Sequence, residues 1–256
     1  MAVIKCEFRS DVLQIDTAMN VILPQEARAD TPDGKLPALY LLHGMSDDES
    51  AWLRRTSIER YAVPLGIAVI MPDGGRSFYT DMARGPKYWT FLTEELPCIA
   101  RSFFPLSDRR EYNYIAGLSM GGYGAFKAAL GRPDMFAAAA SLSGALDMAA
   151  LGEHADDYAE EFTNIFGYLD RIKGSENDLF YLADKVSRGK AAAPALYQCC
   201  GTEDFLYGAN VKFKNYCDKI ALAVTYEESP GDHNWAFWDE YIQRVLAWLP
   251  IPPIAA

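Results

Sequence analysis

Short apolar runs alternate with segments of helical periodicity along most of the 256-residue chain. The runs at residues 37–42, 67–71 and 195–201 are predominantly apolar, which is typical of strands buried on both faces of a sheet. Between residues 88 and 104, by contrast, apolar positions recur at helical spacing. The alternation of the two patterns predicts an α/β fold, with a mostly parallel central sheet and helices on both of its faces.

Weaker patterns complete the predicted order of elements. Residues 6–9 and 17–23 read as strands, and we predict that they form an antiparallel pair at a sheet edge. Pro97 interrupts the helix of residues 88–104, so we expect a kink there or a later start. The remaining predicted strands are 111–116, 136–144 and 223–227, and the remaining predicted helices are 57–63, 124–130, 206–221 and a closing helix that ends at Pro250.

Residues 147–193 differ from the rest of the chain because they are acidic and carry interleaved aromatic side chains. We predict several short helices, inserted after a strand as a cap on a single domain that spans residues 1–256. This composition fits a lid that faces a substrate, and it fits equally well a solvated helical pair that covers the sheet.

A G-x-S-x-G motif lies between a predicted strand and a predicted helix, at residues 117–121. A serine at such a sharp reversal is held in a strained conformation, so the hydroxyl of Ser119 projects above the sheet edge as a candidate nucleophile. Gly117 and Gly121 flank it because a Cβ at either position would collide with the neighbouring strand or helix. The backbone N–H of Met120, at the helix start, is predicted to stabilise an oxyanion.

A serine nucleophile needs a general base, and the chain contains three histidines. His233 follows the last predicted strand on a loop that reaches over the carboxyl edge of the sheet, and we predict that it is the base. His43 ends a central strand and suits a structural role, in which it holds the adjacent loop. His154 lies in the acidic insertion and is interpreted as a surface residue. The three form no H-x-x-E-H or H-x-H pattern, so we expect no metal.

The imidazole in turn needs a carboxylate on its other nitrogen. Asp204 ends a predicted strand at the same edge as Ser119 and is our prediction. The alternative, Asp232, is adjacent to His233, where the two side chains rarely meet; we expect it to cap the final helix or to shape the turn. A second oxyanion donor should come from the loop after an early central strand, and we choose the N–H of Met45.

Composition excludes several kinds of partner. A formal net charge of −11 argues against nucleic acid, because no basic stripe is present to neutralise phosphates. No apolar run approaches the ~20 residues that cross a bilayer, and the first residues lack the layout of a signal peptide. We therefore expect a cytoplasmic protein that does not bind membranes. The cysteines are predicted to be buried, reduced thiols: Cys6, Cys98, Cys199, Cys200 and Cys217.

Five runs of the chain resemble those of bacterial tributyrin esterases, namely LLHGMS, WLRRTSIERY, EELP, GLSMGGYGAFK and SLSGALD. These enzymes belong to the esterase D group of α/β-hydrolases, which includes S-formylglutathione hydrolases and feruloyl esterases. The resemblance covers most of the chain and is weakest at residues 147–193. It implies the α/β-hydrolase fold. It also implies that the family's triad falls on Ser119, Asp204 and His233, and that its oxyanion donors fall on Met45 and Met120. It also implies hydrolysis of short acyl or hydroxycinnamoyl esters without a cofactor, often by a cytoplasmic homo-oligomer.

The residues and the resemblance together predict a serine carboxylesterase for small short-chain acyl esters of the tributyrin or acetyl type. Ser119 attacks the carbonyl, His233 takes its proton and Asp204 supports the imidazolium, before water releases the acid from the acyl-enzyme. The alternatives are a feruloyl or hydroxycinnamoyl esterase, a thioesterase of the S-formylglutathione hydrolase type, an acyltransferase, and a non-catalytic hydrolase-fold binding protein. Five aromatic residues are candidates both for the pocket and for the core, so no substrate-binding residue is assigned: Trp52, Tyr79, Tyr123, Phe205 and Trp235.

Overall fold

A computed structural model describes residues 1–25, 31–153, 158–189 and 191–254. Its eight strands form one sheet in the order β1-β2-β4-β3-β5-β6-β7-β8. The strands are β1 (Ala2–Ser10), β2 (Ile15–Leu23), β3 (Ala38–Leu42), β4 (Ala68–Pro72), β5 (Asn113–Leu118), β6 (Ala138–Leu142), β7 (Ala195–Gly201) and β8 (Val224–Ser229). Strands β3 to β8 run parallel to one another, as predicted from the alternation of apolar runs and helices.

The N-terminal strands β1 and β2 form the antiparallel pair that the sequence predicts, and β1 is an edge of the sheet. Both strands are longer than the predicted ranges. Lys5, Glu7 and Arg9 of β1 are exposed on one face, and charged side chains on an edge strand discourage pairing with a second chain.

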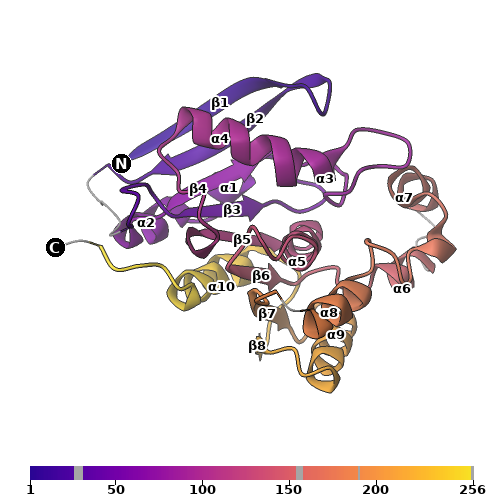
Figure 1. The fold of residues 1–256 in the computed structure, drawn as a ribbon. Helices are drawn as coiled ribbons and strands as arrows, with labels where there is room; N and C mark the ends of the chain where they lie inside the picture. The colour runs from indigo at the N-terminus through magenta and orange to yellow at the C-terminus, as the bar shows by residue number, and fades with distance from the viewer. Residues whose placement is uncertain (26–30, 154–157, 190, 255–256) are drawn as a thin grey trace.

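Helices cover both faces of the sheet (Figure 1). The α-helices are α1 (Ala51–Arg55), α2 (Ile58–Ala62), α3 (Tyr88–Thr90), α4 (Leu96–Phe103), α5 (Met120–Gly131), α6 (Met148–Glu153), α7 (Ala159–Phe166), α8 (Leu179–Arg188), α9 (Tyr207–Lys219) and α10 (Trp235–Trp248). Short 3-10 helices occupy Val63–Leu65, Arg110–Tyr112 and Leu169–Arg171. Helix α1 is an element that the sequence pattern does not predict.

The hydrophobic core has two halves, one on each face of the sheet. Helices α4, α5, α8 and α9 pack on one face, and α1, α2 and α10 pack on the other. Strand β3 serves both halves, because Tyr40 and Leu42 point into the first while Leu39 and Leu41 point into the second. A strand with two buried faces has no polar positions, which explains its continuous apolar sequence.

The interruption expected at Pro97 takes the form of a π-helical turn. Residues Phe91–Glu95 form this turn between α3 and α4, and Pro97 lies in the first turn of α4. Proline has no N–H to donate and its ring clashes with the carbonyl four residues earlier, so the wider turn accommodates it.

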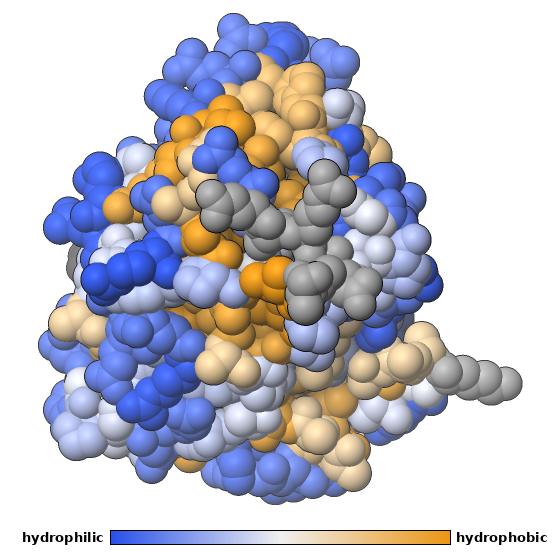
Figure 2. Space-filling view, turned by 90° about the vertical axis from the view of Figure 1, so that its left-hand side faces the viewer, coloured by the Kyte–Doolittle hydropathy of each residue, from blue (hydrophilic) through white to orange (hydrophobic). Residues whose placement is uncertain are grey.

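The segment of residues 147–193 contains the short helices α6, α7 and α8, as predicted. Helices α6 and α7 lie on the opposite side of the molecule from the two chain termini (Figure 1). Figure 2 shows the side on which the termini lie, where hydrophobic residues gather in the middle and hydrophilic residues form most of the rim. Within the described residues, none of the helices combines the length and the apolar character that crossing a membrane requires.

Lys127 of α5 is a buried charged residue in the first half of the core. Its Nζ donates a hydrogen bond to the Thr80 hydroxyl at 2.7 Å and lies 5.0 Å from the centre of the Trp89 ring. Burial lowers the pKa of Lys127 to about 7, although Asp81 and Glu176 partly oppose the change.

This pKa gives the stability of the protein a predictable dependence on pH. Between pH 7 and pH 10.5 the unfolded chain binds a proton at Lys127 that the folded chain does not, so the free energy of unfolding rises with pH by up to about 1.4 kcal/mol per unit. We expect Lys127→Met to be more stable than the wild type near pH 7, with the difference shrinking toward pH 10. Urea unfolding at each pH measures it. Lys185→Met, at an exposed position, is the control. The prediction would be contradicted if the free energy of unfolding changed equally with pH in the wild type, Lys127→Met and Lys185→Met.

Candidate active site

Ser119 lies at the sharp turn between β5 and α5. Its backbone has φ 53° and ψ −116°, a conformation that L-residues rarely adopt. The turn is possible because two neighbours lack side chains: a Cβ at Gly117 would lie 2.4 Å from the carbonyl carbon of Gly121, and a Cβ at Gly121 would lie 2.5 Å from the Leu42 carbonyl oxygen. The predicted reason for both glycines is therefore confirmed.

His233 lies on the loop between β8 and α10 and contacts two of the other predicted residues. Its Nδ1 is 2.8 Å from Oδ2 of Asp204, and its Nε2 is 3.0 Å from the Ser119 hydroxyl oxygen. A carboxylate only accepts hydrogen bonds, so Nδ1 carries the proton and Nε2 is free to accept from the serine. The structure thus brings together Ser119, His233 and Asp204 from three different strand ends, in the arrangement that suits nucleophilic catalysis.

Asp204 follows the end of β7, and its side chain is fully buried. Burial raises the pKa of Asp204, but hydrogen bonds from His233 and from the Leu206 N–H lower it by a larger amount. The net pKa is therefore below the ordinary value. The carboxylate is therefore ionised at neutral pH and can stabilise a protonated imidazole.

The alternative carboxylate, Asp232, has a different role. Its Oδ1 accepts the backbone N–H of His233 at 2.7 Å, so it shapes the turn before α10. It does not cap that helix, because Asn234 occupies the N-cap and accepts the N–H groups of Ala236 and Phe237.

Met120 and the loop that contains Met45 lie beside Ser119. Met120 is the first residue of α5, and first-turn N–H groups have no partner within their helix. On the other side, a Cβ at Gly44 would lie 3.7 Å from Cβ of Ser119, which places the loop after β3 against the serine. Met45 follows in that loop, and its carbonyl accepts a hydrogen bond from Arg76 at 3.5 Å.

His43 has the structural role that the sequence predicts. Its buried imidazole accepts the Gly74 N–H at Nε2 (2.8 Å) and, with Nδ1 protonated, donates to the Gly44 carbonyl (2.7 Å). The Tyr79 hydroxyl donates to the carbonyl of His43 at 3.0 Å, and the Trp52 indole donates to that of Leu42 at 3.0 Å. These bonds fix the loop that presents Met45. Sequence reasoning predicts the role of His43 but not these two aromatic partners. His154, the third histidine, lies outside the described residues.

The aromatic candidates for the pocket divide between core and surface. Trp52, Tyr79 and Tyr123 are buried core residues. Phe205 is 74% exposed, and its ring centre lies 4.6 Å from that of His233. An exposed aromatic ring against the imidazole marks the entrance to the site. The prediction of buried cysteines is confirmed for Cys199, Cys200 and Cys217, but Cys6 is only half-buried and Cys98 is exposed on α4.

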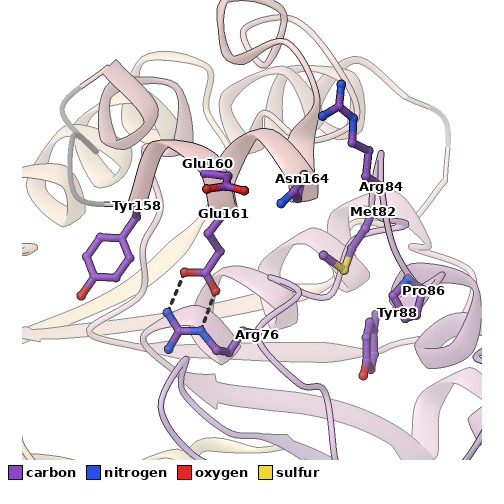
Figure 3. A pocket seen from close by; sticks show the side chains of 9 residues that line it. All are labelled: Arg76, Met82, Arg84, Pro86, Tyr88, Tyr158, Glu160, Glu161 and Asn164. Atoms are coloured by element: carbon purple, nitrogen blue, oxygen red, sulfur yellow. Dashed lines mark hydrogen bonds and ion pairs between the residues drawn. The ribbon is translucent and has the colours of Figure 1, made fainter.

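Two cavities adjoin segments of this site, and most of the side chains that line the first are polar or charged. It has a volume of about 550 Å³ and lies between the loop after β4 and helix α7. Figure 3 shows Arg76 and Glu161 in direct contact in its lining, with Arg76 Nε 2.5 Å from Glu161 Oε1 and Nη2 2.7 Å from Oε2. Since Arg76 also contacts the Met45 carbonyl, this cavity adjoins the predicted oxyanion loop.

The second cavity is smaller, about 340 Å³, and its lining is mostly apolar. Its walls come from the start of α9, from α6 and from the segment after β6, and the Asp147–Lys212 ion pair is its charged part. Two of the residues that line it adjoin the site, because the Ala145 N–H donates to the Ser119 carbonyl at 3.2 Å and Phe205 packs on His233.

Comparison with known proteins gives a consistent result. Residues 10–249 match the family model Esterase, described as "Putative esterase". An acetyl esterase of Caldicellulosiruptor saccharolyticus is 33% identical over 97% of this chain and 98% of its own length.

Solved structures agree with the sequence matches. The fluorophosphonate-binding serine hydrolase FphF of Staphylococcus aureus is 39% identical, with a TM-score of 0.89 over 97% of this chain and 98% of that one. An S-formylglutathione hydrolase, FrmB, of the same organism is also 39% identical, with a TM-score of 0.86 and the same coverage. The strand order and these neighbours establish the predicted α/β-hydrolase fold.

The close contact at Gly121 leads to a test of the turn. In Gly121→Ala the new Cβ would lie 2.5 Å and 2.7 Å from the carbonyl oxygens of Leu42 and His43, so α5 must move away from the loop after β3. We expect a lower Tm, by the equivalent of about 1–3 kcal/mol, and a loss of ester hydrolysis. In Gly208→Ala nothing lies within 4 Å of the new Cβ, and a helical alanine should stabilise the protein slightly. A wild-type Tm and activity for Gly121→Ala would contradict this account.

Proposed function

Since this chain belongs to the Esterase family and is a carboxylic ester hydrolase, we propose that it hydrolyses esters of short acyl chains through Ser119, His233 and Asp204. The observation that carries the proposal is the pair of contacts made by one imidazole, 3.0 Å to the serine hydroxyl and 2.8 Å to a buried carboxylate. The relative named acetyl esterase supports a short acyl group.

The geometry supports an acyl-enzyme mechanism. His233 Nε2 accepts the proton of Ser119 as its oxygen attacks the ester carbonyl, and the Asp204 carboxylate stabilises the imidazolium that forms. The N–H groups of Met120 and Met45 bind the oxygen of the tetrahedral intermediate, helped by the dipole of α5. His233 then protonates the departing alcohol, and it activates the water that releases the acid.

We assign the acyl chain to the apolar cavity beside Phe205, because an alkyl group gains free energy only from apolar walls. The polar cavity beside Arg76 then faces the part of the substrate that leaves. This polar lining, together with the neighbour named S-formylglutathione hydrolase, favours a second candidate, a thioesterase with a polar leaving group.

The serine variant tests the proposed mechanism. We expect Ser119→Ala to lose p-nitrophenyl acetate hydrolysis by at least about 10³-fold, because no nucleophile remains to form the acyl-enzyme. Labelling by a fluorophosphonate probe should be lost as well, while the Tm stays within a few degrees of that of the wild type. Hydrolysis at the wild-type rate by the folded variant would refute Ser119 as the nucleophile.

A substrate series tests the acyl site. Each methylene that enters the apolar cavity contributes up to about 0.8 kcal/mol, and butyrate has two more than acetate, so p-nitrophenyl butyrate should exceed the acetate in kcat/KM by up to about 15-fold. Ala209→Phe fills this cavity and should remove that advantage while the acetate is still hydrolysed.

The matched control introduces the same side chain into the polar cavity. Asn164→Phe should leave the butyrate-to-acetate ratio unchanged. A changed ratio in Asn164→Phe and an unchanged one in Ala209→Phe would place the acyl chain in the polar cavity and refute the assignment. Methyl ferulate and S-formylglutathione, measured with the wild type, distinguish the feruloyl esterase and thioesterase alternatives.

A further inference from the structure

The apolar cavity beside Phe205 has a larger neighbour on the side of α8. This distal cavity has a volume of about 570 Å³, and its walls come from α6, α8, α9 and the segment before α8. Three residues line both cavities, namely Asp147, Ala150 and Lys212. The side chains of Asp147 and Lys212 form an ion pair, so a charged contact lies at the boundary between the two cavities.

Three elements of the fold hold this ion pair in place. Asp147 lies just before α6 with its side chain buried, and its Oδ1 also accepts the Ala150 N–H at 3.3 Å. Lys212 comes from α9, and its Nζ lies 5.5 Å from the centre of the Phe180 ring on α8. The carboxylate is therefore fixed at the start of α6, and the ammonium reaches it from α9 against an aromatic face.

An alkyl chain that fills the apolar cavity meets an obstacle at this boundary. To continue into the distal cavity it must displace the lysine side chain and part the two charges beside an apolar group, which is costly because each charge then loses its partner. The rest of the lining presents no such cost, since it is largely apolar: Ala145, Leu151, Leu206 and Ala209. An acyl chain in this cavity should therefore end at the ion pair.

The distal cavity would suit a longer chain if the ion pair were absent. Phe180, Tyr181 and Tyr216 form part of its wall. The rings of Phe180 and Tyr216 pack edge to face, with their centres 5.1 Å apart, which gives a continuous aromatic surface. Without the lysine over Phe180, this surface is available to an alkyl group.

We propose that the Asp147–Lys212 ion pair is the end wall of the acyl site, and that Lys212 thereby restricts the enzyme to short acyl chains. This inference rests on the proposed function, because it requires the acyl chain to lie in the cavity beside Phe205. Lys212 acts on the choice of substrate and not on the chemical step, since its partners are Asp147 and the Phe180 ring.

Shortening Lys212 tests the wall. Lys212→Ala removes the charge and the long side chain, so the two cavities should join. We expect the wild type to favour p-nitrophenyl butyrate over the octanoate in kcat/KM, and Lys212→Ala to raise the octanoate-to-butyrate ratio by about tenfold or more. Octanoate has four more methylenes than butyrate, and each one that enters apolar surroundings is worth up to about fourfold in kcat/KM.

Two matched variants control for the loss of a lysine. Lys212→Arg keeps a long cationic side chain opposite Asp147 and should retain the wild-type ratio. Lys214→Ala removes a lysine of the same helix that pairs with Asp218 and lines neither cavity, so both the ratio and the activity should be those of the wild type. The side chain of Lys212 is 62% exposed and its ion pair contributes little to stability, so the Tm of Lys212→Ala should stay within a few degrees of the wild-type value.

The outcomes separate a failure of the wall from a failure of the acyl site. The wall is refuted if Lys212→Ala keeps the wild-type ratio while Ala209→Phe removes the preference for butyrate over acetate, and the proposed function then stands. A wild type that already favours the octanoate, or an equal rise of the ratio in Lys212→Arg or Lys214→Ala, would also refute it. If Ala209→Phe keeps the preference for butyrate, the acyl chain lies elsewhere and this inference falls with that assignment.

Discussion

The close backbone contact between the β5–α5 turn and the end of β3 is the constraint on which the rest of the structure depends. Gly117 and Gly121 have no side chains, so the strained turn at Ser119 can lie within van der Waals distance of the neighbouring strand and loop. The same contact brings two sources of backbone N–H groups to one point, the start of α5 and the loop that contains Met45. The hydroxyl of Ser119 and the proposed oxyanion donors therefore depend on one packing arrangement.

Asp204 and Lys127 are both buried, and the number of their hydrogen-bond partners decides whether each keeps its charge near neutral pH. In both cases withdrawal from water disfavours the charged form. Asp204 receives donors on both oxygens and keeps a pKa below the ordinary value. Lys127 has one hydroxyl and the faces of aromatic rings, and its pKa falls to about 7. The buried carboxylate beside His233 thus stays charged at neutral pH, whereas the buried ammonium in the core loses its charge more easily.

The sequence predicts the sheet, its order of elements and the residues that meet at its edge, because these depend on local periodicity and on where parallel strands end. Features set by packing between distant segments are not predicted. Nothing in the local pattern distinguishes Tyr79, buried beneath the oxyanion loop, from Phe205, exposed at the entrance. The cap of α10 falls on Asn234 and not on Asp232, a difference of two residues that depends on loop geometry.

Helix α7 of the inserted segment has one face in the core and another at the polar cavity. One face buries Phe162 and Ile165 in the core, and Phe162 packs 5.3 Å from the ring of Phe78 in the loop after β4. The opposite face presents Glu161 to the polar cavity, where Arg76 joins it to the carbonyl of Met45 (Figure 3). Because the two faces are separate, polar substitutions on α7 can change the shape and charge of the cavity without disturbing the core. The same ion pair links those substitutions to the loop that is proposed to bind the oxyanion, so α7 both packs on the core and lines the polar cavity.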